Sequence, residues 1–135
     1  MYRTTFYLLL SSLILLFQAC QPAAQQVAES ASLKTGTWRA TIELQGQQLP
    51  FTFEVTSEDS SGYQGYLING EERLLIDDVQ LSGDSLLMPM SFFDTQIEAR
   101  ILGDQLEGTF VKNYAEGYRL PFHAAHGEDY RFIRT

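Results

Sequence analysis

Two histidines near the C-terminus are of the residue type that binds transition metals. His123 and His126 are three residues apart, and Glu128 and Asp129 follow them closely. Imidazole nitrogens and carboxylate oxygens are common zinc ligands. However, apolar and polar residues alternate around the histidines, which predicts a strand, and side chains three apart on a strand point to opposite faces. We therefore expect a solvated strand edge here and no metal site.

Paired carboxylates at Glu71-Glu72 and Asp77-Asp78 have the composition of a general acid–base pair. Such catalysis needs two carboxylates that converge on a substrate and have different pKa values. Adjacent residues of a strand diverge, and both pairs lie near predicted turns, so we expect surface charges that aid solubility. The sequence also lacks a G-x-S-x-G motif, a phosphate-binding glycine loop and an H-E-x-x-H motif. We therefore predict no catalytic residues and no cofactor, and an enzyme that acts alone is the least favoured function.

The single cysteine, Cys20, excludes an intrachain disulfide and a C-x-x-C redox pair. It follows an apolar run over residues 6–17, which is typical of a secretory signal peptide and too short for a membrane span of about 20 residues. Residues 17–20 (Phe-Gln-Ala-Cys) resemble a lipobox, the acylation site of bacterial lipoproteins, although the first two depart from the usual aliphatic and small residues. We predict a signal peptide over residues 1–19 and lipidation at Cys20; the alternative is an ordinary signal-peptidase site beside an unmodified cysteine.

Residues 20–35 are rich in Ala, Gln and Ser without apolar periodicity, which predicts a flexible tether. Residues 21–23 lack the acidic run that some bacteria use for surface display, so we expect an exported protein, lipid-anchored to a membrane and facing the periplasm. The net charge of −8 opposes binding to nucleic acid and adsorption to anionic lipid. Contact with the membrane should therefore depend on the lipid anchor.

Residues 36–135 are expected to form one domain, in which apolar and polar residues alternate with a period of two. Turn sequences such as Asn69-Gly70 and Gly103-Asp104 separate the alternating runs, which predicts about eight or nine antiparallel strands. No helical periodicity follows Thr35, so the signal peptide is the only expected helix. We predict an all-β fold, a single antiparallel up-and-down β-barrel that closes its own edges, with a β-sandwich as the alternative.

Two resemblances accompany this prediction. Gly36-Thr37-Trp38, together with Arg131 or Arg134, resembles the G-x-W start and terminal arginine of lipocalin-like barrels. That resemblance implies an arginine stacked on Trp38 at one end of the barrel. A longer resemblance, to the β-rich N-terminal region of envelope lipoproteins related to TlpA and ResA, covers about residues 36–135 and is carried by the segments 36–55, 69–73, 83–90 and 130–132.

Relatives of TlpA and ResA carry a thioredoxin-fold domain with a C-x-x-C motif after this region. The present chain ends at Thr135, about where that domain would begin, so we expect the accessory domain alone, without the thiol-disulfide oxidoreductase activity. The resemblance implies an interaction module that is associated with an envelope redox protein. Whether the chain is a natural stand-alone protein or a part of a larger reductase is left open.

Two apolar segments, residues 88–93 and 114–118, are candidates for contact with an apolar ligand or a partner domain. Their candidate residues are Met88, Met90, Phe92, Phe93, Tyr114 and Tyr118. The alternative is that Phe92 and Phe93 plug one end of the barrel. The predicted function is therefore the accessory module, and the alternative is a lipocalin-like carrier of a small apolar molecule. A carrier needs an internal cavity, whereas a docking module should have a filled interior and an apolar outer patch.

Overall fold

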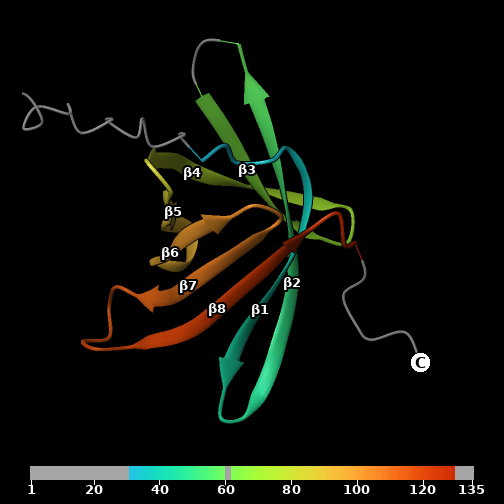
Figure 1. Ribbon diagram of the computed structural model, residues 1–135. Helices are drawn as coiled ribbons and strands as arrows, with labels where there is room; N and C mark the ends of the chain where they lie inside the picture. The colour runs from blue at the N-terminus through green and yellow to red at the C-terminus, as the bar shows by residue number, and fades with distance from the viewer. Residues whose placement is uncertain (1–30, 60–61, 130–135) are drawn as a thin grey trace, which may run out of the picture.

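The computed structural model describes residues 31–59 and 62–129, which form an all-β domain. Its eight strands follow one another around a closed barrel in chain order, each antiparallel to its neighbours (Figure 1). β1 pairs with β8 and closes the sheet, so the predicted up-and-down barrel is confirmed. The elements are β1 (Gly36–Leu44), β2 (Gln47–Glu58), β3 (Gly62–Asn69), β4 (Glu72–Ser82), β5 (Ser85–Met90), the 3₁₀ helix η2 (Ser91–Phe93), β6 (Thr95–Leu102), β7 (Gln105–Lys112) and β8 (Arg119–His126).

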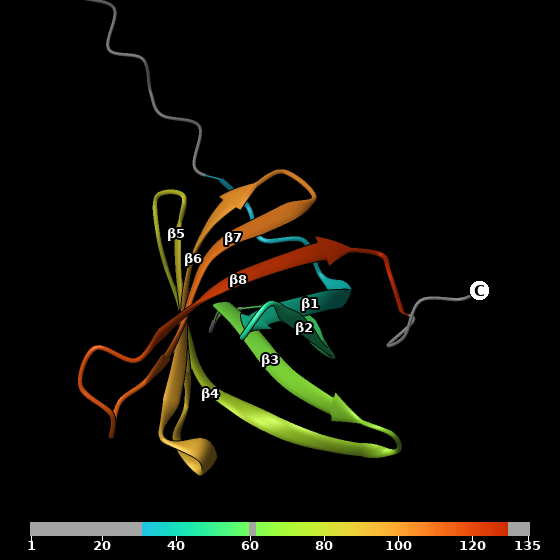
Figure 2. The same cartoon turned by 90° about the horizontal axis from the view of Figure 1, so that it is seen from below.

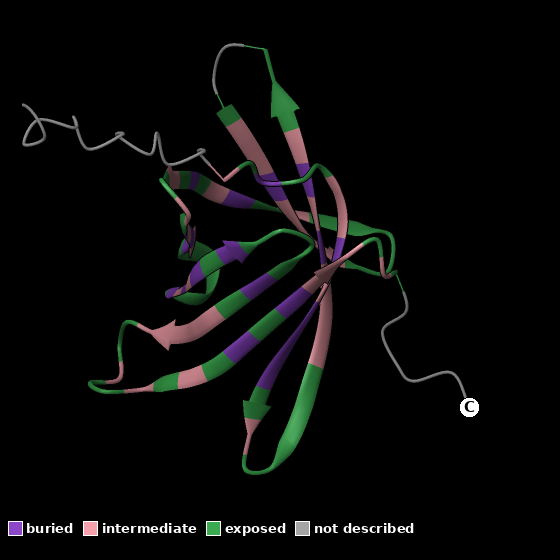
Figure 3. Ribbon diagram, in the orientation of Figure 1, coloured by how far each residue is buried: buried purple, intermediate pink, exposed green. Residues whose placement is uncertain are grey.

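Alternation along the strands places one set of side chains inside the barrel, as Figure 3 shows by bands of buried and exposed residues. Trp38 pairs with Phe53 on β2 and with His126 on β8, so that register brings the rings of three neighbouring strands to one level. The inward set forms one core: Trp38, Ala40, Ile42, Phe53, Val55, Ile76, Val79, Leu86, Met88, Met90, Ile97, Ala99, Ile101, Leu106, Phe122 and Ala124, joined by Leu33.

Every strand runs between the same two ends of the barrel. We call one the closed end; it carries residues 31–35 and the turns 83–84 and 103–104. We call the other the mouth; it carries the turns 45–46 and 70–71, η2 and the loop 113–118. Figure 2 shows the β7–β8 loop and η2 lying away from the segment that leads into β1.

The closed end is packed by the residues that precede β1 and by Trp38. Leu33 is only 2% exposed and belongs to the core. The Trp38 indole N–H donates to the carbonyl oxygen of Lys34 at 2.9 Å, and its ring stacks on Phe53 with centroids 6.2 Å apart. The rings of His126 and Trp38 pack edge to face, with centroids 5.1 Å apart. Residues 31–35 therefore pack against the barrel, although their composition predicts that they belong to the flexible tether.

The predicted ring partners of Trp38 at the C-terminus, Arg131 and Arg134, lie outside the described residues, as do the expected signal peptide and Cys20.

A β-bulge explains why the alternation is irregular in β4. Tyr63 pairs with Val79, whereas Gly65 pairs with Ile76, so β4 has an extra residue opposite β3. Both Ile76 and Val79 therefore point inward although they are three residues apart. A Cβ atom at Gly65 would lie 3.2 Å from Ile76 Cβ, so glycine fits where these two side chains meet.

Candidate functional site: the apolar mouth of the barrel

The barrel has an apolar pocket of about 220 Å³ at its mouth. Most of its lining side chains occupy inward positions near the mouth ends of different strands, and a side chain of η2 completes it. The pocket, which we call the mouth pocket, is lined by Ile42, Phe51, Leu67, Met90, Phe93 and Phe110. These residues are all apolar because they continue the inward face of the core up to the barrel's edge.

η2 crosses the mouth between β5 and β6, and hydrogen bonds hold it there. The backbone N–H of Ser91 donates to Asp77 Oδ2 at 2.8 Å, and the N–H of Asp94 donates to the Ser91 carbonyl at 3.1 Å. Asp94 has a φ of 50°, the left-handed conformation that ends the short helix. Hydrogen bonds from the Ser91 hydroxyl and backbone N–H lower the pKa of Asp77, which therefore stays ionised as an acceptor at neutral pH.

Phe92 and Phe93 form part of the rim and do not plug the barrel. No residue of η2 is buried, and Phe93 is 53% exposed although it lines the mouth pocket. The two rings pack edge to face with centroids 4.5 Å apart. An aromatic pair therefore borders the pocket with its outer side in solvent.

The β7–β8 loop supplies the polar part of the rim. Lys112 Nζ lies 4.2 Å from the ring centroid of Tyr118 and 5.9 Å from that of Tyr114. The loop is fixed by the Lys112 N–H, which donates to the Tyr118 carbonyl at 3.1 Å, and by the Asn113 N–H, which donates to the Asp94 carbonyl at 3.0 Å. Partial desolvation opposes the charge on Lys112, but its interactions with Tyr118 and Tyr114 outweigh that effect and raise its pKa.

Of the six side chains that the sequence singled out, Met90 and Phe93 line the mouth pocket. Phe92, Tyr114 and Tyr118 lie on its rim. Met88 differs, because it is fully buried in the core and has no accessible surface with which to contact a ligand or a partner. The sequence analysis did not single out Ile42, Phe51, Leu67 and Phe110, which belong to the alternating apolar faces of their strands and carry no signal that separates pocket from core.

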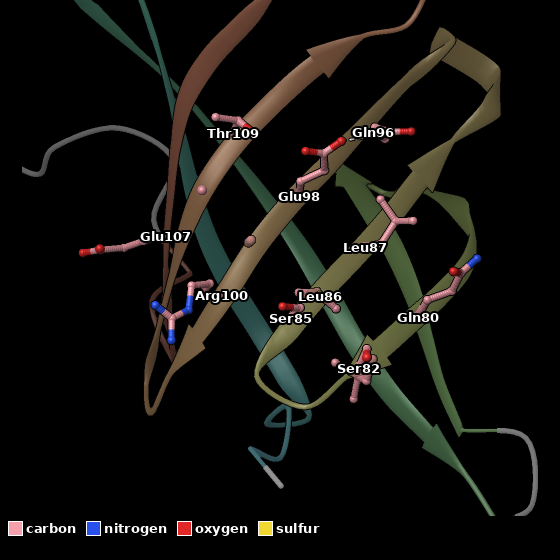
Figure 4. A pocket seen from close by; sticks show the side chains of 13 residues that line it. Gln80, Ser82, Ser85, Leu86, Leu87, Gln96, Glu98, Arg100, Glu107 and Thr109 are labelled. Carbon is pink, nitrogen blue, oxygen red and sulfur yellow. Dashed lines mark hydrogen bonds between the residues drawn. The ribbon is translucent and has the colours of Figure 1, made fainter. Parts of the chain in front are cut away.

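A larger groove of about 640 Å³ lies on the outer face of β4 to β7 (Figure 4). Two of its charged lining residues already have partners: Arg100 is paired with Asp84, and Glu98 is paired with Arg119. Gln96 also donates to Glu98, at 2.6 Å. A ligand that used these groups would have to break existing pairs in a groove open to water, so the mouth pocket is the better candidate.

The residues that first suggested other chemistry do not converge. His126 faces inward at the closed end, where its Nε2 lies 2.7 Å from the Thr35 carbonyl oxygen, while His123 lies on the outer face beside Thr41. Asp77 and Asp78 lie at the bulge within β4 and not at a turn, and each has a separate hydrogen-bond partner. Within residues 31–59 and 62–129, no group of three or more His, Cys, Asp or Glu residues could hold a metal ion.

The described part of the chain contains no helix of the length and apolarity needed to span a membrane. Comparison with family models, with curated proteins and with solved structures finds no match for this chain.

Proposed function

We propose that this protein is a lipid-anchored envelope protein that carries a small apolar molecule in the mouth of its barrel. The observation that carries the proposal is the mouth pocket itself, a concave site of about 220 Å³ lined entirely by apolar side chains at one end of the barrel. Contact between water and apolar side chains is unfavourable in free energy, so an apolar ligand that displaces this water binds favourably. At the opposite end, the side chains of Leu33 and Trp38 are buried in the core.

The volume of the pocket limits the size and affinity of the ligand. Typical drug-sized ligands occupy pockets of about 300–1,000 Å³, so this one suits a smaller molecule. Since one water-sized group takes about 30 Å³, about seven such groups fit. At about 0.8 kcal/mol for each buried methylene, seven groups give about 5–6 kcal/mol, which sets a dissociation constant no tighter than about 0.1 mM.

Titration calorimetry with 1-octanol tests the proposal on the exported protein carrying Cys20→Ser, which has no acyl group to compete. Leu67→Trp should fill the mouth pocket and abolish binding. The matched control is Leu75→Trp, because Leu75 is exposed on the outer face of β4 and its substitution leaves the pocket unchanged. Phe93→Ala, at an exposed rim position, should weaken binding without affecting folding.

Failure of the unsubstituted protein to bind 1-octanol at millimolar concentration would refute the carrier function. Equal binding by folded Leu67→Trp protein would place the ligand elsewhere.

The lipid anchor is supported by the lipobox-like sequence that ends at Cys20. An acyl chain contributes about 0.8 kcal/mol for each buried CH₂, so an anchor with several chains holds a protein at a membrane permanently. Residues 31–35 join the barrel at its closed end, so the chain that follows Cys20 enters the barrel at the end opposite the mouth. Cys20→Ser should abolish incorporation of labelled fatty acid, and undiminished labelling would exclude the anchor.

The accessory role beside a TlpA-like oxidoreductase, which the resemblance implies, has less support. Such a role calls for clustered apolar side chains on the outside of the barrel. Of the large apolar side chains exposed in the described residues, Leu49, Phe92, Phe93 and Tyr114 lie at the mouth, and Leu75 and Leu102 lie on the outer faces of different strands. The exposed apolar surface is therefore concentrated where the ligand enters.

A further inference from the structure

A row of three inward-facing residues crosses the mouth beside the pocket. Met90 on β5 pairs with Thr95 on β6, and Thr95 pairs with Lys112 on β7. Neighbours in such a row have Cβ atoms about 4.5–5.5 Å apart. Met90 lines the mouth pocket, and Phe110, another lining residue, lies two positions before Lys112 on the same face of β7, about 7 Å along the strand. Lys112 therefore stands at the rim, directly above the apolar wall.

Lys112 places a positive charge at this rim. None of the ion pairs among the described residues includes it, although Asp94 and Glu116 belong to the adjoining segments. Its Nζ lies over Tyr118 and interacts with the side chains of Tyr118 and Tyr114. An ammonium has three N–H donors, so Lys112 can also donate a hydrogen bond to an oxygen acceptor of a ligand. A carboxylate makes a stronger, charge-assisted hydrogen bond with an ammonium than neutral acceptors do.

Thr95 provides a second, independent indication of a polar ligand group at this place. It is 3% exposed, and its hydroxyl oxygen has no hydrogen-bond partner within residues 31–59 and 62–129. A buried hydroxyl without a partner is costly, and native proteins seldom leave one unsatisfied. In the row, Thr95 lies between Met90, which lines the mouth pocket, and Lys112.

We infer that the ligand of the mouth pocket is a small unbranched monocarboxylic acid, whose carboxylate is bound by Lys112 Nζ and whose hydrocarbon tail occupies the pocket. This inference rests on the proposed carrier function and adds the class of ligand to it. The pocket accepts about seven water-sized groups, which corresponds to the tail of an acid such as octanoate. Because the net charge of −8 repels anions over long range, selection of the acid depends on this local contact.

The test compares three probes that share one tail: octanoate, 1-octanol and octylamine. Each is titrated by calorimetry into the exported protein carrying Cys20→Ser, alone and with Lys112→Met, which keeps an apolar stem but removes the charge. Lys34→Met is the matched control, since Lys34 is the only other lysine of the chain and lies at the closed end, paired with Asp104. Equal melting temperatures would show that both variants fold.

We expect octanoate to bind at least tenfold more tightly than octylamine, and Lys112→Met to weaken octanoate about tenfold or more. The same substitution should change 1-octanol affinity less than about twofold, and Lys34→Met should leave all three probes unchanged. Thr95→Val should weaken octanoate as well, by removing the hydroxyl while keeping the shape of the side chain.

Two failures can be told apart. If 1-octanol binds the unsubstituted protein but octanoate binds Lys112→Met and the parent equally, the carboxylate inference is overturned and the carrier function stands. If no probe binds, the carrier function fails, and this inference fails with it.

Discussion

Gly108, on the inward face of β7, is the glycine at which an added Cβ atom would meet the closest neighbours among the described residues. It pairs with Ala99 of β6, and a Cβ atom added to it would collide with the carbonyl oxygen of Glu98 and lie 2.6 Å from Ala99 Cα. Both obstacles are backbone atoms of the neighbouring strand, which cannot turn aside as a flexible side chain can. Gly108→Ala therefore forces β6 and β7 apart at the centre of their ladder.

The size of the effect follows from this geometry. Overpacking a well-packed site costs about 1–3 kcal/mol, occasionally more, and an obstacle made of backbone places Gly108→Ala at about 3 kcal/mol. For a domain of this size each kcal/mol lowers the melting temperature by about 4–8 °C, so we expect a loss of about 12–24 °C. Gly65→Ala is the matched control, because the added methyl would meet only side-chain atoms, at 3.2 Å and beyond, and should cost about 1 kcal/mol or less.

Thermal melts followed by far-UV circular dichroism and by the fluorescence of Trp38, the only tryptophan, measure both variants. If Gly108→Ala melts no lower than Gly65→Ala, the close approach of β6 and β7 and the register between them are wrong.

Three further predictions concern other parts of the barrel. Leu33→Ala should lower the free energy of unfolding by about 2–5 kcal/mol in urea melts because Leu33 is buried in the core; a change below about 0.5 kcal/mol would mean that residues 31–35 do not pack. Asp77→Ala should speed amide hydrogen exchange at Ser91 by removing its acceptor, and unchanged exchange would contradict the anchoring of η2. Arg100, Arg119 and Lys34 lower the pKa values of Asp84, Glu98 and Asp104 respectively. A carboxyl group whose pKa is lower in the folded state stabilises the fold at pH values above its unfolded pKa of about 4. That stabilisation is lost as the pH falls through the folded pKa. The urea midpoint should thus stay level between about pH 5 and 8 and decrease below about pH 4, less steeply in Arg100→Gln; a midpoint that rises on acidification would contradict these pairings.

Much of the fold could be predicted because period-two alternation and turn sequences are local signals. Runs such as Trp38 to Leu44 have one apolar face, and Asn69-Gly70 gives a tight turn. The antiparallel pairing of adjacent strands could therefore be predicted without knowledge of the complete barrel. Pairing of β1 with β8 closes the sheet, and the sequence predicts this closure because an open sheet would leave two strand edges unpaired. The bulge of β4 was not predictable, because it depends on how Ile76 and Val79 share the space that Gly65 leaves.

The candidate site was only partly predictable for a similar reason. An inward-facing aromatic residue has the same alternating pattern around it whether it fills the core, as Phe53 does, or lines an open pocket, as Phe51 and Phe110 do. Which of these occurs depends on whether another segment covers that end of the barrel. Leu33 covers the closed end, whereas η2 leaves the mouth pocket accessible.

The central claim, that an apolar ligand enters the barrel at its mouth, is tested most directly by amide chemical-shift mapping. In a titration of the ¹⁵N-labelled protein with octanoate, the largest shift changes should cluster on the strand ends that line the mouth pocket and on η2. Residues of the closed end, such as Leu33 and Trp38, should stay unchanged. Shift changes that cluster on the outer groove of β4 to β7 would contradict the claim. So would the absence of any shift change when millimolar octanoate and, in a second titration, millimolar 1-octanol are added.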